Sequence, residues 1–394
     1  MQTTTNVDIK LQLKNISQRL NTTESQQAFN NDWSLLNGLS GLALANYYYL
    51  NKYTEHSFLT SQSNHSLIDS IIHLVNNDNE IGTTFCSGLS GFAWFYNHLV
   101  NLDYIQDADL SLLGDFDTMF HKMAIWELKR GNYDFLHGAI GYGLYLLDRY
   151  DIQKNKTHIE EIIDLLVDSS IEDKYGVKWG KYDEFDEKKR YNLGLAHGIP
   201  SIIVFLSKCY DLDIKRDKLK PIIEKGVSFL NNQRTSSLSS LSLFPGLATQ
   251  NTESNSSRLA WCYGDLGIAN SFLFAGKSLH NNEFIDFSKT TVTHASFRRG
   301  LIENGIEDAT FCHGSSGVAY MFSKFHDFFD DSDSMLDAKN HWLDKTLEYI
   351  APYDFSKINN ENAGLLNGFA GIYLTLTSML SDDKYSWDKC ILFS

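Results

Sequence analysis

The chain has few prolines and no long apolar run. Four prolines in 394 residues leave room for long helices, because proline interrupts a helix by removing a backbone donor. No segment approaches the roughly 20 consecutive apolar residues that a membrane-spanning helix needs, and residues 1–10 lack the apolar centre of a signal peptide. We therefore expect a helical protein with no transmembrane segment, located in the cytoplasm.

The sequence also lacks a basic excess and an even set of cysteines. It contains 34 Lys and Arg against 49 Asp and Glu, a formal net charge of −15, which argues against nucleic acid as a partner because phosphate contacts need a basic face. The cysteines are Cys86, Cys209, Cys262, Cys312 and Cys390. In a reducing compartment they stay free, so disulfides are not expected and a metal site is allowed.

What the sequence has instead is a repeat. Seven glycines, spaced 50 to 66 residues apart, each open an apolar run, and in six copies a second glycine follows three residues later. The seven are Gly38, Gly88, Gly138, Gly198, Gly264, Gly314 and Gly368. The fourth copy reads Gly198-Ile199-Pro200-Ser201, and a proline in a first helical turn costs nothing. Each motif is therefore predicted to start a buried helix.

The segments between the motifs are more polar and have helical spacing. In one of them Ile159, Ile162, Ile163 and Leu166 lie three and four residues apart, with acidic residues on the other face. Helix pairs repeated at such a period form an open solenoid or a closed ring. Neither end carries a polar capping unit, which favours the ring. We predict an all-α fold, an α/α toroid of seven helical hairpins and fourteen helices, whose inner-helix N-termini line one cavity mouth.

Repeats from residue 38 to residue 371 leave no room for a domain boundary, so residues 1–394 are predicted to form a single domain. The longest charged stretch with weak periodicity, residues 172–191, precedes the fourth motif. It is interpreted as a solvated loop or hairpin, and the alternative is a flap over the cavity mouth.

Two successive motifs carry metal-ligand side chains directly before their glycine. The fifth reads Trp261-Cys262-Tyr263-Gly264, and the sixth reads Phe311-Cys312-His313-Gly314. Two thiols and an imidazole suit Zn²⁺, which in catalytic sites takes three protein ligands and keeps a fourth position open. Helix N-termini also favour ionised thiols. We predict one zinc ion held by Cys262, Cys312 and His313.

Cys86 has the same offset from its glycine as these two cysteines. In a seven-membered ring, however, its motif is three units away from the fifth. Cys86 is therefore predicted to be a core residue, and Cys209 and Cys390 are predicted to be structural or incidental.

Other motifs place proton-transfer groups at equivalent turns. His197 precedes Gly198 directly, and Asp134 lies four residues before Gly138. A histidine titrates near neutral pH and can donate or accept a proton, whereas an aspartate at such a turn often caps a helix instead. His137 has the same offset as His197, and the residues alone do not rank it lower.

Taken together, these motifs resemble the lanthipeptide cyclases, the LanC-like family. The resemblance spans Gly38 to Gly371 and includes the Gly-x-x-Gly repeats, Trp-Cys-Tyr-Gly followed by Cys-His-Gly, and the segments around Asp134 and His197. It implies a stand-alone class I cyclase with an α/α-toroid fold. Such an enzyme uses zinc to add peptide cysteine thiols to dehydroalanine or dehydrobutyrine, which closes lanthionine and methyllanthionine rings by Michael addition.

The resemblance also implies roles for individual residues. It makes Cys262, Cys312 and His313 the zinc ligands and His197 and Asp134 the acid/base groups, and it gives His137 no support. It adds Arg258 and Tyr263 as matches to family positions near the metal.

The implied partners are a dehydrated precursor peptide with its leader, a dehydratase, and an exporter assembly that would hold the cyclase at the inner membrane. Three alternatives stay open at this point. They are a relative that adds glutathione or another thiol to dehydroamino acids, a thiol-binding scaffold with structural zinc, and a carbohydrate-active enzyme, which would need paired carboxylates at the cavity mouth.

Overall fold

A computed structural model describes the chain as two compact units. The first comprises Met1–Leu99 and Ile306–Ser394, and the second comprises Val100–Gly305. The structure describes residues 2–22, 27, 29–53, 55–106, 111–151, 153–180, 191–235, 237, 239–248, 256–329, 333–359, 361–381 and 385–394. That residues 1–394 form a single domain stays a prediction.

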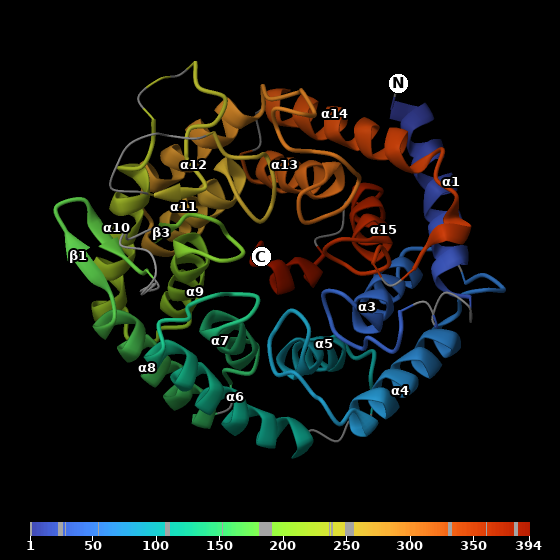
Figure 1. The fold of residues 1–394 in the computed structure, drawn as a ribbon, viewed down its shortest axis with the longest axis horizontal. Coiled ribbons are helices and arrows are strands. Elements are labelled where there is room, and N and C mark those ends of the chain that lie inside the picture. The colour runs from blue at the N-terminus through green and yellow to red at the C-terminus, as the bar shows by residue number, and fades with distance from the viewer. Residues whose placement is uncertain are drawn as a thin grey trace. The chain divides into compact units, whose positions relative to one another are not determined.

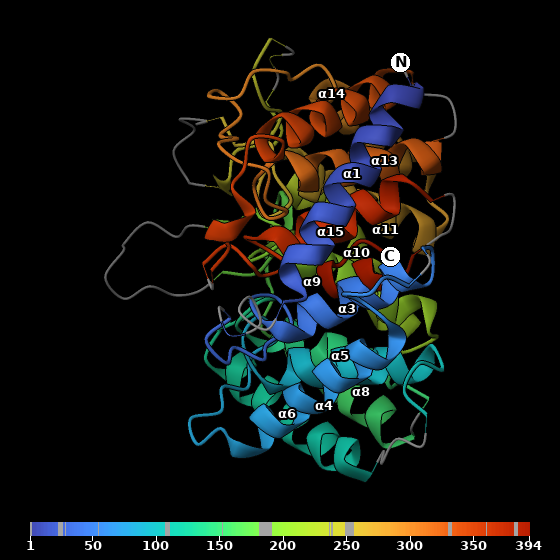
Figure 2. The same ribbon diagram turned by 90° about the vertical axis from the view of Figure 1, so that its right-hand side faces the viewer.

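The first unit is built from helices of both ends of the chain. They are α1 (Gln2–Leu20), α3 (Leu39–Leu50), α4 (Ser61–Asn77), α5 (Leu89–Asn101), α13 (Ser315–Phe329), α14 (Asp333–Ile350) and α15 (Phe369–Met379), with the short 3-10 helices η1 (Phe355–Lys357) and η2 (Trp387–Ile391). Helix α1 packs against α14 and α15, as Figure 2 shows. Helix α15 in turn packs against α3 and α13, so the N-terminal and C-terminal segments share one core.

The second unit contains a continuous part of the chain. Its helices are α6 (Ser111–Lys129), α7 (Ala139–Asp148), α8 (Gln153–Asp168), α9 (Ile199–Asp211), α10 (Arg216–Asn231), α11 (Asp265–Leu279) and α12 (Asn282–Ala295). Helix α9 packs against α7, α10 and α11 (Figure 1). The described residues thus hold fourteen α-helices, the number predicted. None of them combines the length and apolar character needed to cross a membrane.

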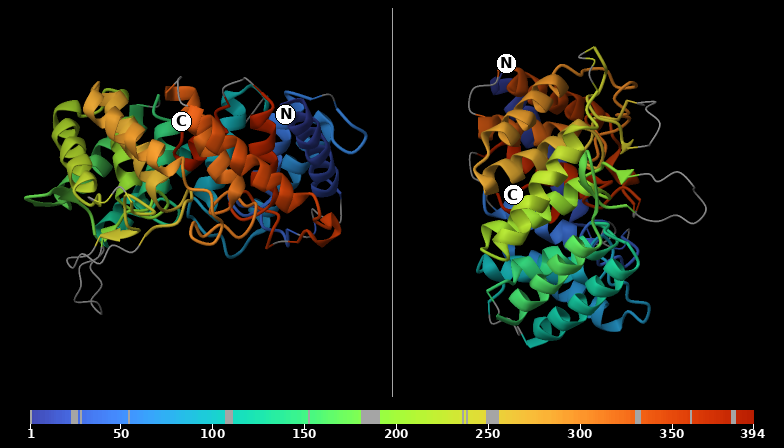
Figure 3. Two further views of the ribbon diagram at one scale, coloured as in Figure 1. Left: turned by 90° about the horizontal axis from the view of Figure 1, so that it is seen from above. Right: turned by 90° about the vertical axis from the view of Figure 1, so that its left-hand side faces the viewer.

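Two small antiparallel sheets accompany these helices. Strand β1 (Ile171–Asp173) pairs with β2 (Gly176–Lys178), and β3 (Tyr191–Asn192) pairs with β4 (Leu247–Ala248). The β1–β2 hairpin packs against α10 and is drawn in green in Figure 3. It lies at the start of the charged stretch 172–191, but residues 181–190 are outside the described residues. That this stretch acts as a flap stays a prediction.

All seven motif glycines are followed at once by a helix, as predicted. These helices are buried nearly all round; in α3 every residue from Leu39 to Tyr49 is buried. The helices between them are amphipathic. In α8 the predicted apolar positions are fully buried, whereas Glu161 on the other face is exposed. The buried positions are Ile159, Ile162, Ile163 and Leu166.

A repeated hydrogen bond closes the turn in front of these helices. In five motifs the first helical N–H donates to the carbonyl oxygen of the residue six positions before the motif glycine. The donor–acceptor pairs are Leu39–Asp32, Leu89–Gly82, Ala139–Asn132, Ser315–Asp308 and Phe369–Asn362, at 2.8–3.2 Å. Each bond satisfies an N-terminal donor that has no partner within its own helix.

The second glycine of the motif is required by close backbone approach. A Cβ atom at Gly317 would collide with the carbonyl oxygen of Phe311, and one at Gly371 would collide with that of Leu365. In the fourth motif, Pro200 lies in the first turn of α9 as predicted. There Ser201 replaces the second glycine, and its hydroxyl donates to the carbonyl of Gly198 at 2.8 Å.

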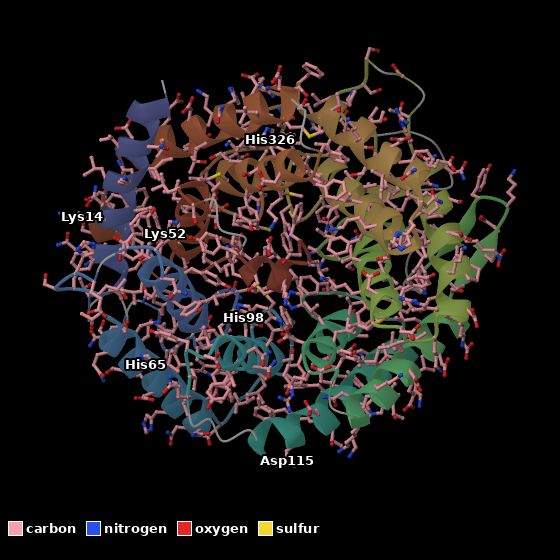
Figure 4. All side chains as sticks on the ribbon, turned by 180° about the vertical axis from the view of Figure 1, so that it is seen from behind. Lys14, Lys52, His65, His98, Asp115 and His326 are labelled. Carbon is pink, nitrogen blue, oxygen red and sulfur yellow. The ribbon has the colours of Figure 1, made fainter. Side chains whose placement is uncertain are left out.

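One buried histidine of the first unit is structural. His98 on α5, labelled in Figure 4, stacks on Trp94 with ring centroids 4.6 Å apart, and its Nε2 pairs with the Tyr48 hydroxyl at 2.8 Å. Burial, together with the charge of Lys389, lowers the pKa of His98 to about 3. His98 is therefore neutral near pH 7 and does not exchange protons there.

Candidate metal and proton-transfer site

The predicted site residues lie in the turns that precede four of the buried helices. Asp134 precedes α7, His197 precedes α9, Arg258, Cys262 and Tyr263 precede α11, and Cys312 and His313 precede α13. The motif therefore places all of these side chains at helix N-termini, where the helix dipole favours negative charge.

His197 and Asp134, predicted separately, form a hydrogen-bonded pair. The Nδ1 atom of His197 lies 2.6 Å from Oδ2 of Asp134. The other carboxylate oxygen of Asp134 accepts the backbone N–H of His137 at 2.8 Å. Asp134 thus uses one oxygen to close its own turn and the other to orient the imidazole. His137 contributes through its backbone, and its side chain is exposed.

The surroundings of His197 raise its pKa above the ordinary value. Burial acts in the opposite direction and is the largest influence, but the hydrogen bond to Asp134, the charge of that carboxylate and the nearby Cys262 outweigh it together. The side chain of His197 is 30% exposed, and that of Asp134 is 19% exposed. A histidine in this setting keeps its proton to a higher pH than usual and still reaches solvent.

The turn that carries Cys262 packs directly against the turn that carries His197. The backbone N–H of Ala196 donates to the carbonyl of Cys262 at 3.3 Å. A Cβ at Gly194 would lie 2.6 Å from the same carbonyl oxygen, so only glycine lets the two turns approach this closely. Cys262 itself is buried. The predicted thiol and the predicted acid therefore occupy neighbouring backbone segments.

Tyr263 is held beside the imidazole. Its hydroxyl accepts a hydrogen bond from the side-chain amide of Asn192 at 2.8 Å, and its ring centroid lies 6.0 Å from that of His197. The same Asn192 accepts the N–H of Gly194 through its side-chain oxygen. Asn192 is not among the site residues predicted from the sequence. It occupies the position six residues before a motif glycine, so an alignment of the seven motifs would have marked it.

Arg258 occupies that same position in the fifth motif, where five other motifs have Asp or Asn. The Arg258 side chain is exposed. A Cβ atom built on Gly305 would lie 3.3 Å from the Cβ atom of Arg258. The side-chain oxygens of the aspartates and asparagines at this position accept backbone N–H groups of their own turns. Asp308, for example, accepts the N–H of Thr310 at 2.8 Å. Arg258 instead presents a cation at the surface of the turn.

Cys312 and His313 are half-buried in the turn before α13. The N–H of Cys312 donates to the carbonyl of Leu366 at 2.8 Å, which fixes the backbone that carries both side chains. Asp308 closes this turn through its carbonyl, which accepts the N–H of Ser315, and through its carboxylate.

The donor set of the two cysteine-bearing turns fits zinc. Cys262 lies in the second unit, Cys312 and His313 lie in the first, and all three are metal-ligand side chains. Two sulfurs and one imidazole nitrogen match the preference of Zn²⁺ for soft and borderline ligands, and a set of three leaves a fourth position for an exchangeable ligand.

The other cysteines have core surroundings. Cys86 is buried, and its sulfur accepts a hydrogen bond from the side-chain amide of Asn37 at 3.6 Å. Cys209 and Cys390 are fully buried, and burial raises the pKa of both thiols. A buried neutral thiol behaves as a small apolar side chain.

Known proteins resemble this chain over its whole length or half of it. A family model described as lanthionine synthetase C-like protein matches residues 30–392. The nisin biosynthesis protein NisC of Lactococcus lactis subsp. lactis is 26% identical over 211 residues, which are 51% of this chain and 48% of that protein. The chain thus matches about half the length of this relative.

Among solved structures, a nisin cyclase superposes with a TM-score of 0.78 at 18% sequence identity. The superposition covers 98% of this chain and 97% of that chain. This likeness confirms the predicted fold class, an all-α α/α toroid.

The pairing of His197 with Asp134 predicts how the histidine titrates. In Asp134→Asn the carboxylate charge that raises the pKa of His197 is lost while burial remains, so the pKa should fall below that of the wild type. NMR titration of the histidine ring signals in the metal-free protein measures it. Asp286→Asn, at an exposed position on α12, should leave the His197 titration unchanged. An unchanged or higher His197 pKa in Asp134→Asn contradicts the pairing.

Proposed function

Since the chain belongs to the lanthionine synthetase C-like family, we propose that it is a zinc-dependent cyclase acting on a ribosomal precursor peptide. It adds cysteine thiols of that peptide to dehydroalanine or dehydrobutyrine and thereby forms lanthionine and methyllanthionine rings. The observation that carries this proposal is the pair of neighbouring turns that present Cys262 and the His197–Asp134 pair. A thiolate ligand beside an oriented proton donor is what thiol addition to an alkene needs.

Cys262, Cys312 and His313 would hold the zinc ion. When bound, Zn²⁺ supplies a positive charge that lowers the pKa of an incoming substrate thiol. The N-termini of α11 and α13, which follow the two turns, stabilise the ionised form of the cysteine ligands.

His197 balances the protons of the reaction. Its Nδ1 is hydrogen-bonded to Asp134, so the other ring nitrogen, Nε2, is the one that exchanges protons with the substrate. Nε2 takes the proton of the substrate thiol. The sulfur then bonds to the β-carbon of the dehydroamino acid, which leaves an enolate. Nε2 returns the proton to the α-carbon, and the addition consumes and releases no net proton.

Three further side chains support this transfer. Asp134 keeps Nδ1 protonated and stabilises the imidazolium, as a carboxylate partner does. Arg258, the exposed cation of the fifth turn, would steady the negative charge that develops on the enolate oxygen. Tyr263, anchored by Asn192, would keep the imidazole ring in place. Holding thiolate and alkene together supplies the remaining acceleration through proximity.

The substrate chemistry defines the partners that this activity requires. A dehydratase must convert serine or threonine of the precursor to the dehydroamino acid before the cyclase acts. We propose that the substrate is this dehydrated peptide with its leader, and that an exporter assembly receives the product.

Removal of one cysteine ligand should abolish both metal binding and activity. We expect Cys262→Ala and Cys312→Ala to lose stoichiometric zinc and to stop cyclising a dehydrated peptide. Cys86→Ala is the matched control, because Cys86 has the same offset from its glycine but lies in the core. Metal content is measured on the purified proteins. Ring closure leaves the peptide mass unchanged, so it is followed as the loss of thiols that can be alkylated. Full zinc and full activity in either ligand variant would refute the assignment.

Replacement of the proton donor should separate metal binding from chemistry. His197→Asn is expected to keep its zinc but to lose roughly a hundredfold or more in the rate of cyclisation.

The assay contains a cysteine-bearing dehydrated peptide in one arm and a cysteine-free dehydrated peptide with glutathione in the other. Turnover of the first peptide by the wild type supports the cyclase. Turnover confined to the glutathione arm identifies a thiol-adding relative instead, and an unchanged rate in His197→Asn removes this residue from the mechanism.

A further inference from the structure

The fifth motif turn is built differently from the others. Its glycine, Gly264, has a φ of +105°, in the left-handed region that favours glycine. The head glycines Gly38, Gly138, Gly198 and Gly368 have φ between −120° and −152°. The fifth motif also has Arg258 where five others have Asp or Asn. The segment 257–264, which we call the Cys262 loop, therefore needs another device to fix its conformation.

One buried guanidinium joins the two ends of the Cys262 loop. Arg298, which follows α12, donates from Nη2 to the carbonyl of Ser257 at 2.7 Å and from Nη1 to the carboxylate of Asp265 at 3.2 Å. Ser257 begins the loop, and Asp265 directly follows it as the first residue of α11. The side chains of Arg298 and Asp265 are 3% and 0% exposed. Arg298 thus closes the loop from inside the core.

The third donor of Arg298 extends this clamp. Its Nε donates to the side-chain oxygen of Asn304 at 2.6 Å. The backbone carbonyl of Asn304 accepts the N–H of Leu259 at 3.0 Å, inside the Cys262 loop. Asn304 is itself fully buried. Each nitrogen of the guanidinium therefore donates to the loop itself, to the residue that directly follows it, or to a residue that binds it.

Asp265 ties the same clamp to a separate segment. Its carboxylate accepts the backbone N–H groups of Leu243 at 3.1 Å and Phe244 at 3.0 Å in addition to Arg298. A carboxylate with these donors is fully satisfied at the N-terminus of α11, where the helix dipole also favours it. The buried charges are paired, so the clamp is rigid.

We propose that Arg298 is a positioning residue that sets the Cys262 loop, and with it the Cys262 sulfur, in the geometry for metal binding. The inference rests on the proposed function in that Cys262 is a metal ligand. A lysine could keep the charge, but it has neither the planar fork nor the three separate donor directions that this clamp uses. Residues that orient ligands from outside the metal site commonly change metal affinity about tenfold to a hundredfold when they are replaced.

The chain offers a matched control in the same unit. Arg149 donates to Asp117 from Nε at 2.8 Å and from Nη2 at 3.1 Å, and these two side chains are 6% and 3% exposed. This pair joins α6 to the end of α7 and does not contact the Cys262 loop through any bond described. Arg149→Lys therefore damages an equally buried Arg–Asp pair without touching the clamp.

The test compares Arg298→Lys with Arg149→Lys in metal binding. The metal-free proteins are titrated with Co²⁺, whose thiolate charge-transfer and ligand-field bands report ligand geometry, and Zn²⁺ affinity is measured by competition with a chelator. We expect Arg298→Lys to weaken Zn²⁺ binding about tenfold or more and to change the Co²⁺ bands. Both variants should lower the urea midpoint of unfolding to a similar extent. Arg149→Lys, however, should keep the wild-type Zn²⁺ affinity and the wild-type Co²⁺ spectrum.

Wild-type binding and spectrum in Arg298→Lys would overturn the inference, as would an equal loss in Arg149→Lys. If Arg298→Lys does not fold, Asn304→Ala carries the same comparison and the same expectations. It removes the acceptor of Nε and the donation of the Asn304 amide to the Gly300 carbonyl, and it leaves the other two bonds of Arg298 in place. A wild-type protein that binds no Co²⁺ with thiolate bands refutes the metal site of the proposed function itself. The positioning role of Arg298 fails in a different outcome, in which the wild type binds Co²⁺ with thiolate bands and Arg298→Lys binds it in the same way.

Discussion

One constraint determines where the chemistry of this protein lies: each motif glycine is followed at once by a buried helix, so the residues before the glycine lie at a helix N-terminus. In five motifs the first helical N–H donates to the carbonyl oxygen six residues before the glycine, which folds the preceding residues into a tight turn over the helix N-terminus. The glycine three positions later lets the helix backbone meet that turn, since a Cβ there would collide with a carbonyl, as at Gly317. Every side chain placed just before a motif glycine therefore lies at a position that favours negative charge.

The same turn serves structure in one repeat and chemistry in another. In the second motif it buries Cys86 against Asn37. In the fourth it presents His197 to Asp134, which the third motif supplies. The fifth motif departs most from the common turn, with a positive φ at Gly264 and the buried Arg298 clamp. Function in this fold is thus set by which side chains the repeated turns carry, and the toroid itself only provides the positions.

The sequence predicted much of this arrangement because its signals are local. The glycine period marked the start of all seven buried helices, and spacing three and four residues apart marked the buried face of α8. The bond between His197 and Asp134 joins different repeats, so each residue could be proposed but their pairing could not. The roles of Asn192 and Arg298 were missed. Asn192 repeats at a fixed offset that an alignment of the motifs would show, whereas the partners of Arg298 lie in three separate segments and follow no period.

X-ray absorption at the zinc edge of the purified, zinc-loaded protein tests the central claim most directly. Cys262, Cys312 and His313 should appear as two sulfur ligands and one imidazole nitrogen, with one light atom in the fourth position. Addition of a small thiol should raise the sulfur count from two to three. A site with four protein ligands that does not change when thiol is added would contradict a catalytic zinc with an open position.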